Sequence, residues 1–360
     1  MISCTKKSVL VGMSGGVDSS AAVLLLLEQG YEVIGCMLEM HTIDEAAKKR
    51  ASTAAEKLGI PLCFADAKDD FKSKVIEPFI YDYFNGRTPN PCILCNPTVK
   101  FNQLIKKADE LGCSYISTGH YSKILYNGTN NNDSRALLYK SQSKKDQSYM
   151  LYRLTQSQLK RLILPLSDMS KDEIRAKATA AGLDEIAQAK DSQEICFING
   201  SHTEYIKNYA KINNISVKKG GFNGNFIDEA GKILGQHDGI FRFTIGQRKG
   251  LGISFGCHMF VTAIDAKNNT VTLGNGETLY CNEITADNAV FIPFHDRNIP
   301  NAMRVSAKVR YAAKPADADF TYLGGNKFKL VFDKPERAPT AGQSVVIYDG
   351  DIVLGGGIII

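Results

Sequence analysis

Several features that would assign a protein to a special class are missing from this chain of 360 residues. No segment approaches the ~20 consecutive apolar residues that a membrane-spanning helix needs. The longest candidate, Ala21 to Leu27, fits one side of a short helix. No apolar stretch followed by a cleavage site precedes the first strand-like segment, so we expect no signal peptide. These absences favour a cytoplasmic protein that does not use a membrane.

The sequence also lacks the features of a disulfide-stabilised or strongly charged protein. Its nine cysteines are odd in number and mostly isolated, which argues against a framework of structural disulfides. The net charge of +5 does not by itself demand a nucleic-acid partner. We find no internal repeat and no extended low-complexity tract. At roughly 100–200 residues per domain, the length indicates two or three domains.

The N-terminal part alternates between strand-like and helix-like patterns. We expect strands at 8–13, 32–38, 61–65 and 115–118, and helices at 18–29 and 44–58. This alternation predicts an α/β domain with a parallel sheet covered by helices on both faces. The proline-rich segment 87–97 is predicted to be a loop. Segment 127–134 is predicted to be the tip of a hairpin between strands near Lys123 and Tyr139.

The amino-acid composition changes after about residue 205, where glycine becomes frequent. From about residue 258, short strand-like runs alternate with turns, which is typical of a small β-barrel or sandwich. We therefore predict an α/β domain at 1–204, a small central domain at 205–275 and a C-terminal β-barrel at 276–360.

A glycine-rich segment joins the first predicted strand to the first predicted helix. It reads Gly12-Met13-Ser14-Gly15-Gly16-Val17-Asp18-Ser19. Glycines let backbone N–H groups approach an anion, and the helix N-terminus attracts negative charge, so the segment favours a phosphate. The order matches neither a Walker A loop nor Gly-x-Gly-x-x-Gly. A plain glycine turn with Asp18 capping the helix is the structural alternative.

The pattern Ser-Gly-Gly-x-Asp-Ser resembles the ATP pyrophosphatase (PP-loop) superfamily. The resemblance implies an adenine-nucleotide α-hydrolase-like fold that splits ATP between its α and β phosphates. It also gives Asp18 a role in holding Mg²⁺ or orienting the phosphates.

Two cysteines narrow the chemistry that would follow activation. Cys95 stands in the proline-rich segment, where burial in a core is not expected. Cys196 lies between Ile195 and Phe197, a setting that by itself favours a core position. We interpret the following as small buried apolar residues: Cys4, Cys36, Cys63, Cys113, Cys257 and Cys281.

Several longer motifs occur in one order along the chain. They are Ser-Gly-Gly-Val-Asp-Ser (14–19), Asn-Pro-x-x-x-Cys-Asn (90–96), Ser-Thr-Gly-His-Tyr (117–121), Lys-Lys-Asp-Gln-Ser-Tyr (144–149), Asp-Ser-Gln-Glu-Ile-Cys-Phe-Ile (191–198) and Phe-Thr-Ile-Gly-Gln-Arg-Lys-Gly-Leu-Gly (243–252). Together they resemble the tRNA-specific 2-thiouridylases over nearly the whole chain. That resemblance implies adenylation of the C2 oxygen of the wobble uridine of tRNA, followed by its replacement with sulfur.

The resemblance also implies roles for individual residues. Cys196 would carry a persulfide received from a sulfur-relay protein, and Cys95 would be the catalytic thiol, the two ending as a disulfide. ATP, with Mg²⁺, would contact Gly12, Met13, Ser14, Gly15, Gly16, Val17, Asp18, Ser19, Leu38 and Gly119. The anticodon stem-loop of tRNA would contact the central domain and Asn90, Pro91, Cys92, His120, Lys145, Asp146, Gln147, Arg310, Tyr311 and Gln343.

One position departs from the family pattern. Many members have Asp where this chain has Cys92, which leaves the general-base role of that Asp open here. The change creates Cys92-x-x-Cys95, and with Cys196 these thiolates could hold an iron–sulfur cluster, as in related thiolases. We favour the persulfide route. The rivals are another PP-loop ligase and a non-catalytic RNA-binding protein, which would release no pyrophosphate.

The segment from Arg304 to Tyr311 alternates basic or polar residues with Val305, Ala307 and Val309. On a strand this alternation gives one apolar and one basic face. Cations beside a tyrosine can hold phosphates and stack on a base, although a solvated strand face is a common alternative.

Overall fold

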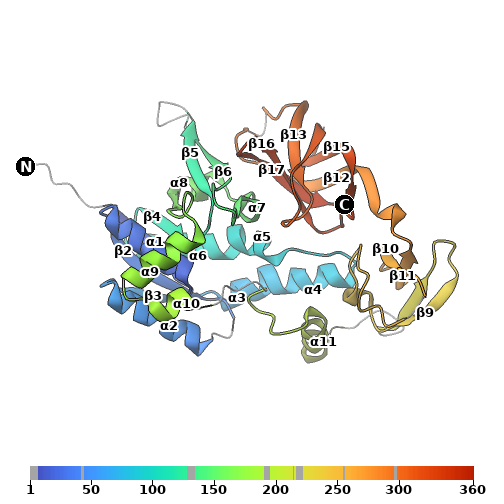
Figure 1. The fold of residues 1–360 in the computed structure, drawn as a ribbon, viewed down its shortest axis with the longest axis horizontal. Coiled ribbons are helices and arrows are strands. Elements are labelled where there is room, and N and C mark those ends of the chain that lie inside the picture. Colours follow the sequence, from blue (N-terminus) through green and yellow to red (C-terminus); the bar gives the residue numbers. More distant parts are fainter. Residues whose placement is uncertain are drawn as a thin grey trace, which may run out of the picture.

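The structure is a computed structural model that describes residues 7–41, 44–127, 134–189, 195–213, 215, 222–253, 256–295 and 298–360. An α/β module, a small central β module and a C-terminal β-barrel follow one another along the chain (Figure 1). This architecture confirms the predicted fold class. In the part of the chain that is described, no helix is both long and apolar enough to cross a membrane.

The α/β module is built on a parallel sheet with the strand order β3-β2-β1-β4-β7. Its strands are β1 (Ser8–Gly12), β2 (Glu32–Glu39), β3 (Leu62–Asp66), β4 (Tyr115–Thr118) and β7 (Leu162–Ile163). Runs of valine, leucine and isoleucine suit strands that are buried on both faces. The four strands predicted here are confirmed to within about a residue at each end.

The predicted proline loop is wrong, because most of that segment is helical. α5 (Pro91–Cys95) runs through the π-helical turn η2 (Asn96–Lys100) into α6 (Phe101–Glu110). Asn90 caps α5 by accepting a hydrogen bond from the Cys92 N–H, at 3.2 Å. Pro91 stands at the first helical position, where a missing N–H costs nothing. The two cysteines of Cys92-x-x-Cys95 therefore lie about one turn apart on a helix.

The sheet of the C-terminal barrel includes a hairpin that belongs to the α/β module in the sequence. The predicted strands are confirmed as β5 (Lys123–Asn127) and β6 (Arg135–Tyr139), although most of the predicted tip lies outside the described residues. β6 pairs with β17 through Tyr139 and Ile352, giving the sheet order β12-β15-β14-β13-β16-β17-β6-β5. A further pairing of β12 with β17 closes the barrel. Its own strands are β12 (Tyr280–Phe291), β13 (Ala302–Lys308), β14 (Ala316–Gly324), β15 (Lys327–Arg337), β16 (Ser344–Asp349) and β17 (Ile352–Ile359).

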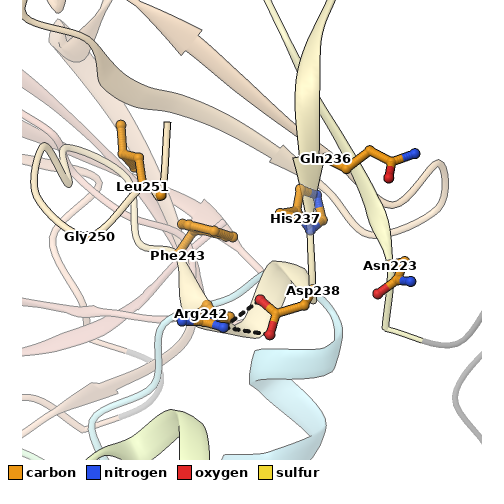
Figure 2. Close-up of a pocket in the computed structure, with 9 residues that line it drawn as sticks. Asn223, Gln236, His237, Asp238, Arg242, Phe243, Gly250 and Leu251 are labelled. Atoms are coloured by element: carbon orange, nitrogen blue, oxygen red, sulfur yellow. Dashed lines mark hydrogen bonds and ion pairs between the residues drawn. The ribbon is translucent and has the colours of Figure 1, made fainter. Parts of the chain in front are cut away.

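The central module is a sheet with the order β10-β11-β8-β9. Its strands are β8 (Gly224–Ile227), β9 (Ile233–His237), β10 (Phe260–Asp265) and β11 (Thr270–Gly274). Beside it lies a polar hollow of about 350 Å³, where Asp238 joins Arg242 (Figure 2). Lys207 of α11 (His202–Ile212) also binds Asp238, at 2.6 Å. None of the residues predicted to act in catalysis lines this hollow.

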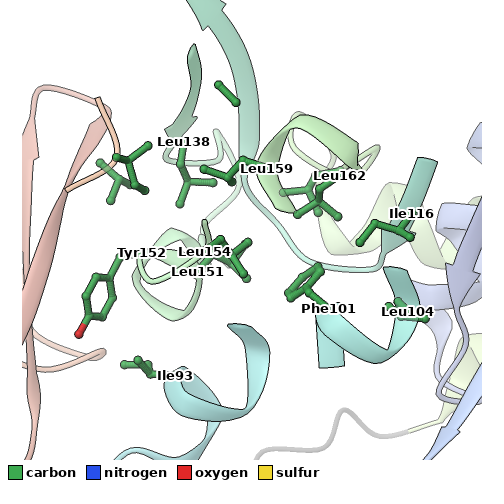
Figure 3. Packing of buried hydrophobic residues seen from close by; sticks show 14 of the residues in the cluster. Ile93, Phe101, Leu104, Ile116, Leu138, Leu151, Tyr152, Leu154, Leu159 and Leu162 are labelled. Carbon is green, nitrogen blue, oxygen red and sulfur yellow. The ribbon is translucent and has the colours of Figure 1, made fainter. Parts of the chain in front are cut away.

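Helices cover both faces of the parallel sheet, as predicted. Val9 and Val11 pack against α1 (Val17–Glu28) and α9 (Lys171–Ala180), and residues of α2 (Glu45–Lys57) join this cluster. Leu10 points the other way, into a second core. Phe101 and Leu104 of α6 belong to this core (Figure 3). That second core also contains Val346, Tyr348 and Val353 of the barrel, so the two modules share buried surface.

The remaining helical elements are short. They are α3 (Lys68–Phe71), the π-helical turn η1 (Lys72–Ile76), α4 (Glu77–Phe84), α7 (Ser148–Leu151), α8 (Gln156–Arg161), α10 (Asp184–Gln188), and the 3-10 turns η3 (Ile240–Arg242) and η4 (Glu277–Leu279).

Candidate functional site

The phosphate loop turns tightly between β1 and α1. Gly15 has a φ of +75°, and a Cβ atom there would stand 2.3 Å from the carbonyl oxygen of Ala47. The Ser19 hydroxyl donates to the Gly16 carbonyl at 2.9 Å and accepts from the Ser14 N–H at 3.2 Å. Only glycine fits at position 15, because both the backbone conformation and the space exclude a side chain.

Asp18 does not cap the helix, so the structural alternative for this residue is wrong. α1 begins at Val17 after Gly16, which makes no side-chain capping bond. The Asp18 carboxylate instead accepts a hydrogen bond from the Tyr121 hydroxyl at 2.6 Å. The Lys171 ammonium contacts both carboxylate oxygens, at 2.7 and 2.9 Å.

The other residues predicted to bind the nucleotide lie at the same edge of the sheet. Gly12 pairs with Cys36 of β2 and with Thr118 of β4, so Leu38 and Gly119 follow on neighbouring strands. A Cβ atom on Gly119 would stand 2.6 Å from the carbonyl carbon of Asp18 and 2.8 Å from the Ser19 nitrogen. The end of β4 therefore packs directly on the phosphate loop. Ligands bind at this carboxyl edge in open parallel sheets.

The burial of the two predicted sulfur-handling cysteines is the reverse of what the sequence suggested. Cys95 is only 6% exposed and packs in an apolar cluster with Val99 and Phe197. Its Sγ lies 3.9 Å from the sulfur of Met40. Cys196 is exposed, because Phe197 and Ile198 occupy the buried positions beside it.

The remaining cysteine predictions have mixed outcomes. Cys36 and Cys113 are buried, as expected, and Cys63 and Cys281 are partly buried. Cys257 is exposed, so the prediction for it is wrong. Cys4, and residues 191–194 of the motif that ends at Ile198, lie outside the described residues.

The three cysteines of interest share one electrostatic environment. Cys196 is exposed by surface area, yet the crowding around its sulfur, followed by the neighbouring Cys92 and Cys95, raises its pKa to about 11. Burial also raises the pKa of Cys95, and the nearby Lys100 opposes this rise by its charge and its backbone N–H. Cys92 has an exposed side chain by surface area, yet the crowding around its sulfur raises its pKa as well. The fold thus brings Cys196 near the helix that carries Cys92 and Cys95.

These thiols do not form a ready set of metal ligands. Across the described ranges, no group of three or more His, Cys, Asp or Glu side chains is arranged to hold a metal ion.

His120 directly follows Gly119, which packs on the phosphate loop. Its Nδ1 is 2.7 Å from the Thr118 hydroxyl, and its ring stands 5.9 Å from that of Phe101. Burial, followed by the charge of Lys100, holds the pKa of His120 well below its usual range. The imidazole is therefore neutral at physiological pH and can donate or accept one hydrogen bond at each nitrogen.

Most of the residues predicted to contact tRNA lie where the barrel meets the α/β module. The Tyr311 hydroxyl donates to the Asp146 carbonyl at 3.3 Å, and Gln343 donates to the Thr88 carbonyl at 2.6 Å. The Asp146 carboxylate accepts from Ser148, and the Gln147 side chain accepts from the Tyr121 N–H, so both also shape the local backbone. This places Arg310, Tyr311 and Gln343 beside the segments that hold Lys145 and Asn90.

The predicted two-faced strand is confirmed over β13, with Val305 and Ala307 buried, but β13 ends at Lys308, so Arg310 and Tyr311 lie beyond the strand. Its basic face is less available than the sequence suggested, because Arg304 forms ion pairs with Asp319 and Asp333. Lys308 instead lies over the rings of Tyr149 and Tyr311, at 5.7 and 5.5 Å from their centroids.

Sequence reasoning missed two residues at the phosphate loop. Tyr121 ends the Ser-Thr-Gly-His-Tyr motif but was given no role. Lys171 follows Ser170, whose Ser-x-x-Glu capping box marks the start of α9 without pointing to a nucleotide. Only the packing of α9 on α1 brings Lys171 to Asp18.

The fold and the loop define a class: a nucleotide-activating α/β enzyme domain with a PP-loop, joined to two β modules. Family profiles match three consecutive parts of the chain. These are a tRNA methyl transferase HUP domain over 7–200, a tRNA methyl transferase PRC-barrel domain over 213–275 and an Aminomethyltransferase beta-barrel domain over 281–359.

The chain belongs to the tRNA-specific 2-thiouridylase family. It is 48% identical to the protein of that name from Acetivibrio thermocellus, over 99% of each chain. It is 46% identical to those of Clostridium botulinum (strain Alaska E43), over 99% of each chain, and Clostridioides difficile, over 98%. A solved structure from Methanocaldococcus jannaschii, described as a predicted subunit of tRNA methyltransferase, is 18% identical with a TM-score of 0.31. It covers 48% of this chain and 76% of its own, and this likeness is too low to add to the argument.

Proposed function

We propose that this protein uses ATP to adenylate the C2 oxygen of the wobble uridine of tRNA and then replaces that oxygen with sulfur. One observation carries the proposal. The charge of Lys100 acts on Cys95, on Cys196 and on His120, and His120 follows Gly119, which packs on the phosphate loop. Family membership supplies the substrate class that this geometry suits.

The phosphate loop accounts for the activation step. Backbone N–H groups at the start of α1 would bind the phosphates, and Leu38 and Gly119 would flank the adenine. The uridine C2 oxygen attacks the α phosphorus, and pyrophosphate leaves with the electrons of the broken phosphorus–oxygen bond. Asp18 is the loop carboxylate suited to Mg²⁺, which would neutralise phosphate charge during this step.

The thiols account for the sulfur step. The exposed Cys196 is accessible to a sulfur-relay protein and would receive the persulfide. The outer persulfide sulfur attacks C2 and AMP leaves. The Cys95 thiolate then attacks the Cys196 sulfur, which forms their disulfide and leaves the transferred sulfur on the base. The electrons balance in these reaction steps, because oxidation of the two thiols to a disulfide supplies the two electrons that reduce the transferred sulfur.

The joint between the modules would receive the tRNA. Anticodon bases are splayed from their stack, so placing one in a pocket costs little. Arg310, Tyr311, Gln343, Lys145, Asp146 and Gln147 would contact the stem-loop from one side, and Asn90, Pro91, Cys92 and His120 would contact the base. We keep residues 1–204, 205–275 and 276–360 as the proposed domains, with the central one also contacting tRNA, and the cytoplasm as the proposed compartment.

The test combines metal analysis with an activity assay. Protein purified without oxygen is analysed for iron and acid-labile sulfide, and aerobic protein is assayed for tRNA thiolation with a persulfide donor. Activity without iron supports the persulfide route. Stoichiometric iron, with activity lost in Cys92→Ser and on removal of the iron, would instead make all three cysteines cluster ligands. Absence of thiolation in both preparations would favour another PP-loop ligase or an RNA-binding protein.

A further inference from the structure

A lysine from a distant part of the chain is built into the phosphate loop. Lys171 is the first residue of α9, and its ammonium reaches the Asp18 carboxylate in the first turn of α1, at 2.7 Å. The Lys171 side chain is only 13% exposed, against 33% for Asp18. The position of this charge is therefore fixed by the packing of two helices.

This ion pair stands in the first turn of α1, directly after the phosphate loop. A carboxylate at the start of α1 repels the triphosphate that the loop would bind, unless a cation neutralises it. The ammonium of lysine is a compact point charge and a common ligand of phosphate. An ammonium held beside this loop is therefore within reach of a phosphate bound at the N-terminus of α1.

We propose that Lys171 binds the β and γ phosphates of ATP. When the nucleotide enters, the Lys171 ammonium would leave the Asp18 carboxylate and contact these phosphates instead. This inference rests on the proposed function, because it assumes that ATP occupies the loop. Asp18 would keep the hydrogen bond from Tyr121, and its carboxylate would be available to help hold Mg²⁺. The ion pair seen in the structure keeps the Asp18 carboxylate paired with a positive charge.

A lysine at this position would also act during adenylation. When the α phosphorus bonds to the uridine oxygen, the bond to the β-phosphate oxygen breaks and negative charge grows on the departing pyrophosphate. A fixed ammonium at the β phosphate stabilises that charge in place of water.

The chain provides a matched control on the same two helices. Lys177 of α9 binds Glu28 of α1 at 2.8 Å, near the opposite end of the α1 helix from the loop. If Lys171 served only to dock α9 on α1, removing either lysine would have the same kind of effect.

The experiment measures equilibrium binding of AMP and of adenosine 5′-(α,β-methylene)triphosphate with Mg²⁺, by calorimetry, on the full-length protein. For Lys171→Met we expect triphosphate affinity to fall about tenfold or more, since a charged hydrogen-bonding partner is lost, while AMP affinity stays within about twofold. Lys171→Arg should retain most of the triphosphate affinity. Lys177→Met should bind both nucleotides as the wild type does.

Two results would overturn the proposal while leaving the proposed function intact. One is unchanged triphosphate binding in Lys171→Met. The other is an equal loss of AMP and triphosphate binding, which indicates distortion of the whole loop. Thermal unfolding of each variant identifies a folding failure, and Lys171→Arg then decides the matter, because restored triphosphate binding requires the charge. A wild-type protein that binds neither nucleotide would contradict the proposed function itself.

Discussion

The two ends of the proposed site differ in how completely they are assembled. At the phosphate loop, Gly15, Gly119 and the contacts of Asp18 with Tyr121 and Lys171 define one tight arrangement. At the cysteine end, Cys95 is buried, Cys196 is exposed, and the pKa of each thiol is raised. The phosphate loop is thus fixed by close packing and paired charges, whereas the raised pKa values favour the protonated form of the thiols.

This difference suits the order of the two steps. Activation needs a fixed geometry, because its barrier falls when charges are placed in advance. The sulfur step needs a nucleophile that stays inactive until the adenylated base is present. A raised thiol pKa provides that restraint, since the thiolate is the reactive form.

The largest effect that would separate the two ends is loss of sulfur transfer without loss of activation. Cys95→Ser and Cys196→Ser should each reduce tRNA thiolation by roughly 10³-fold or more, because a hydroxyl can neither carry a persulfide nor form the disulfide. Pyrophosphate release in the presence of tRNA should continue for a single turnover in both variants. Cys257→Ser, at an exposed cysteine of the central module, is the control and should thiolate normally. A parallel loss of pyrophosphate release would show that the two ends are not separable.

A smaller effect should follow from a substitution in the phosphate loop. Gly15→Ala forces a side chain into a left-handed conformation, which costs about 1–2 kcal/mol, and directs its Cβ against the Ala47 carbonyl. We expect weaker ATP binding together with lower stability in urea unfolding. Gly30→Ala has a similar φ of +82° but nothing within 4 Å of the new Cβ, so it isolates the backbone strain. If both variants bind ATP as the wild type does, the loop is not the nucleotide site.

The smallest effect should come from Lys100, whose charge lowers the pKa values of Cys92, Cys95 and Cys196. In Lys100→Met these pKa values rise further, so less thiolate is present at a given pH. Thiolation should fall roughly fivefold at neutral pH and recover as the pH is raised, because alkali restores the thiolate. The measurement is a pH–rate profile, with Lys106→Met, an exposed lysine of α6, as the control. A uniform loss at every pH would contradict an electrostatic role.

The sequence was most informative where local pattern and structure coincide. The buried strands and the glycine loop can be located because burial requires a run of apolar residues and a positive φ favours glycine. The sequence does not reveal the helix at Pro91, because a proline-rich segment favours a loop, although proline is tolerated at the first helical position. Cys95 is buried because the helix turns its side chain toward the core, and a loop at this segment does not predict that direction. Lys171 could not be found at all, since its contact joins residues 153 positions apart.

The strand pairing between β6 and β17 has a consequence for how the protein comes apart. Because the barrel's sheet continues into a hairpin of the α/β module, separating the two would leave a bare strand edge, which invites aggregation. The buried Tyr149 hydroxyl, which donates to the Ser344 carbonyl at 2.7 Å, would lose its partner at the same time. The first and last thirds of the chain should therefore melt as one cooperative unit, and a fragment ending before the barrel should be insoluble.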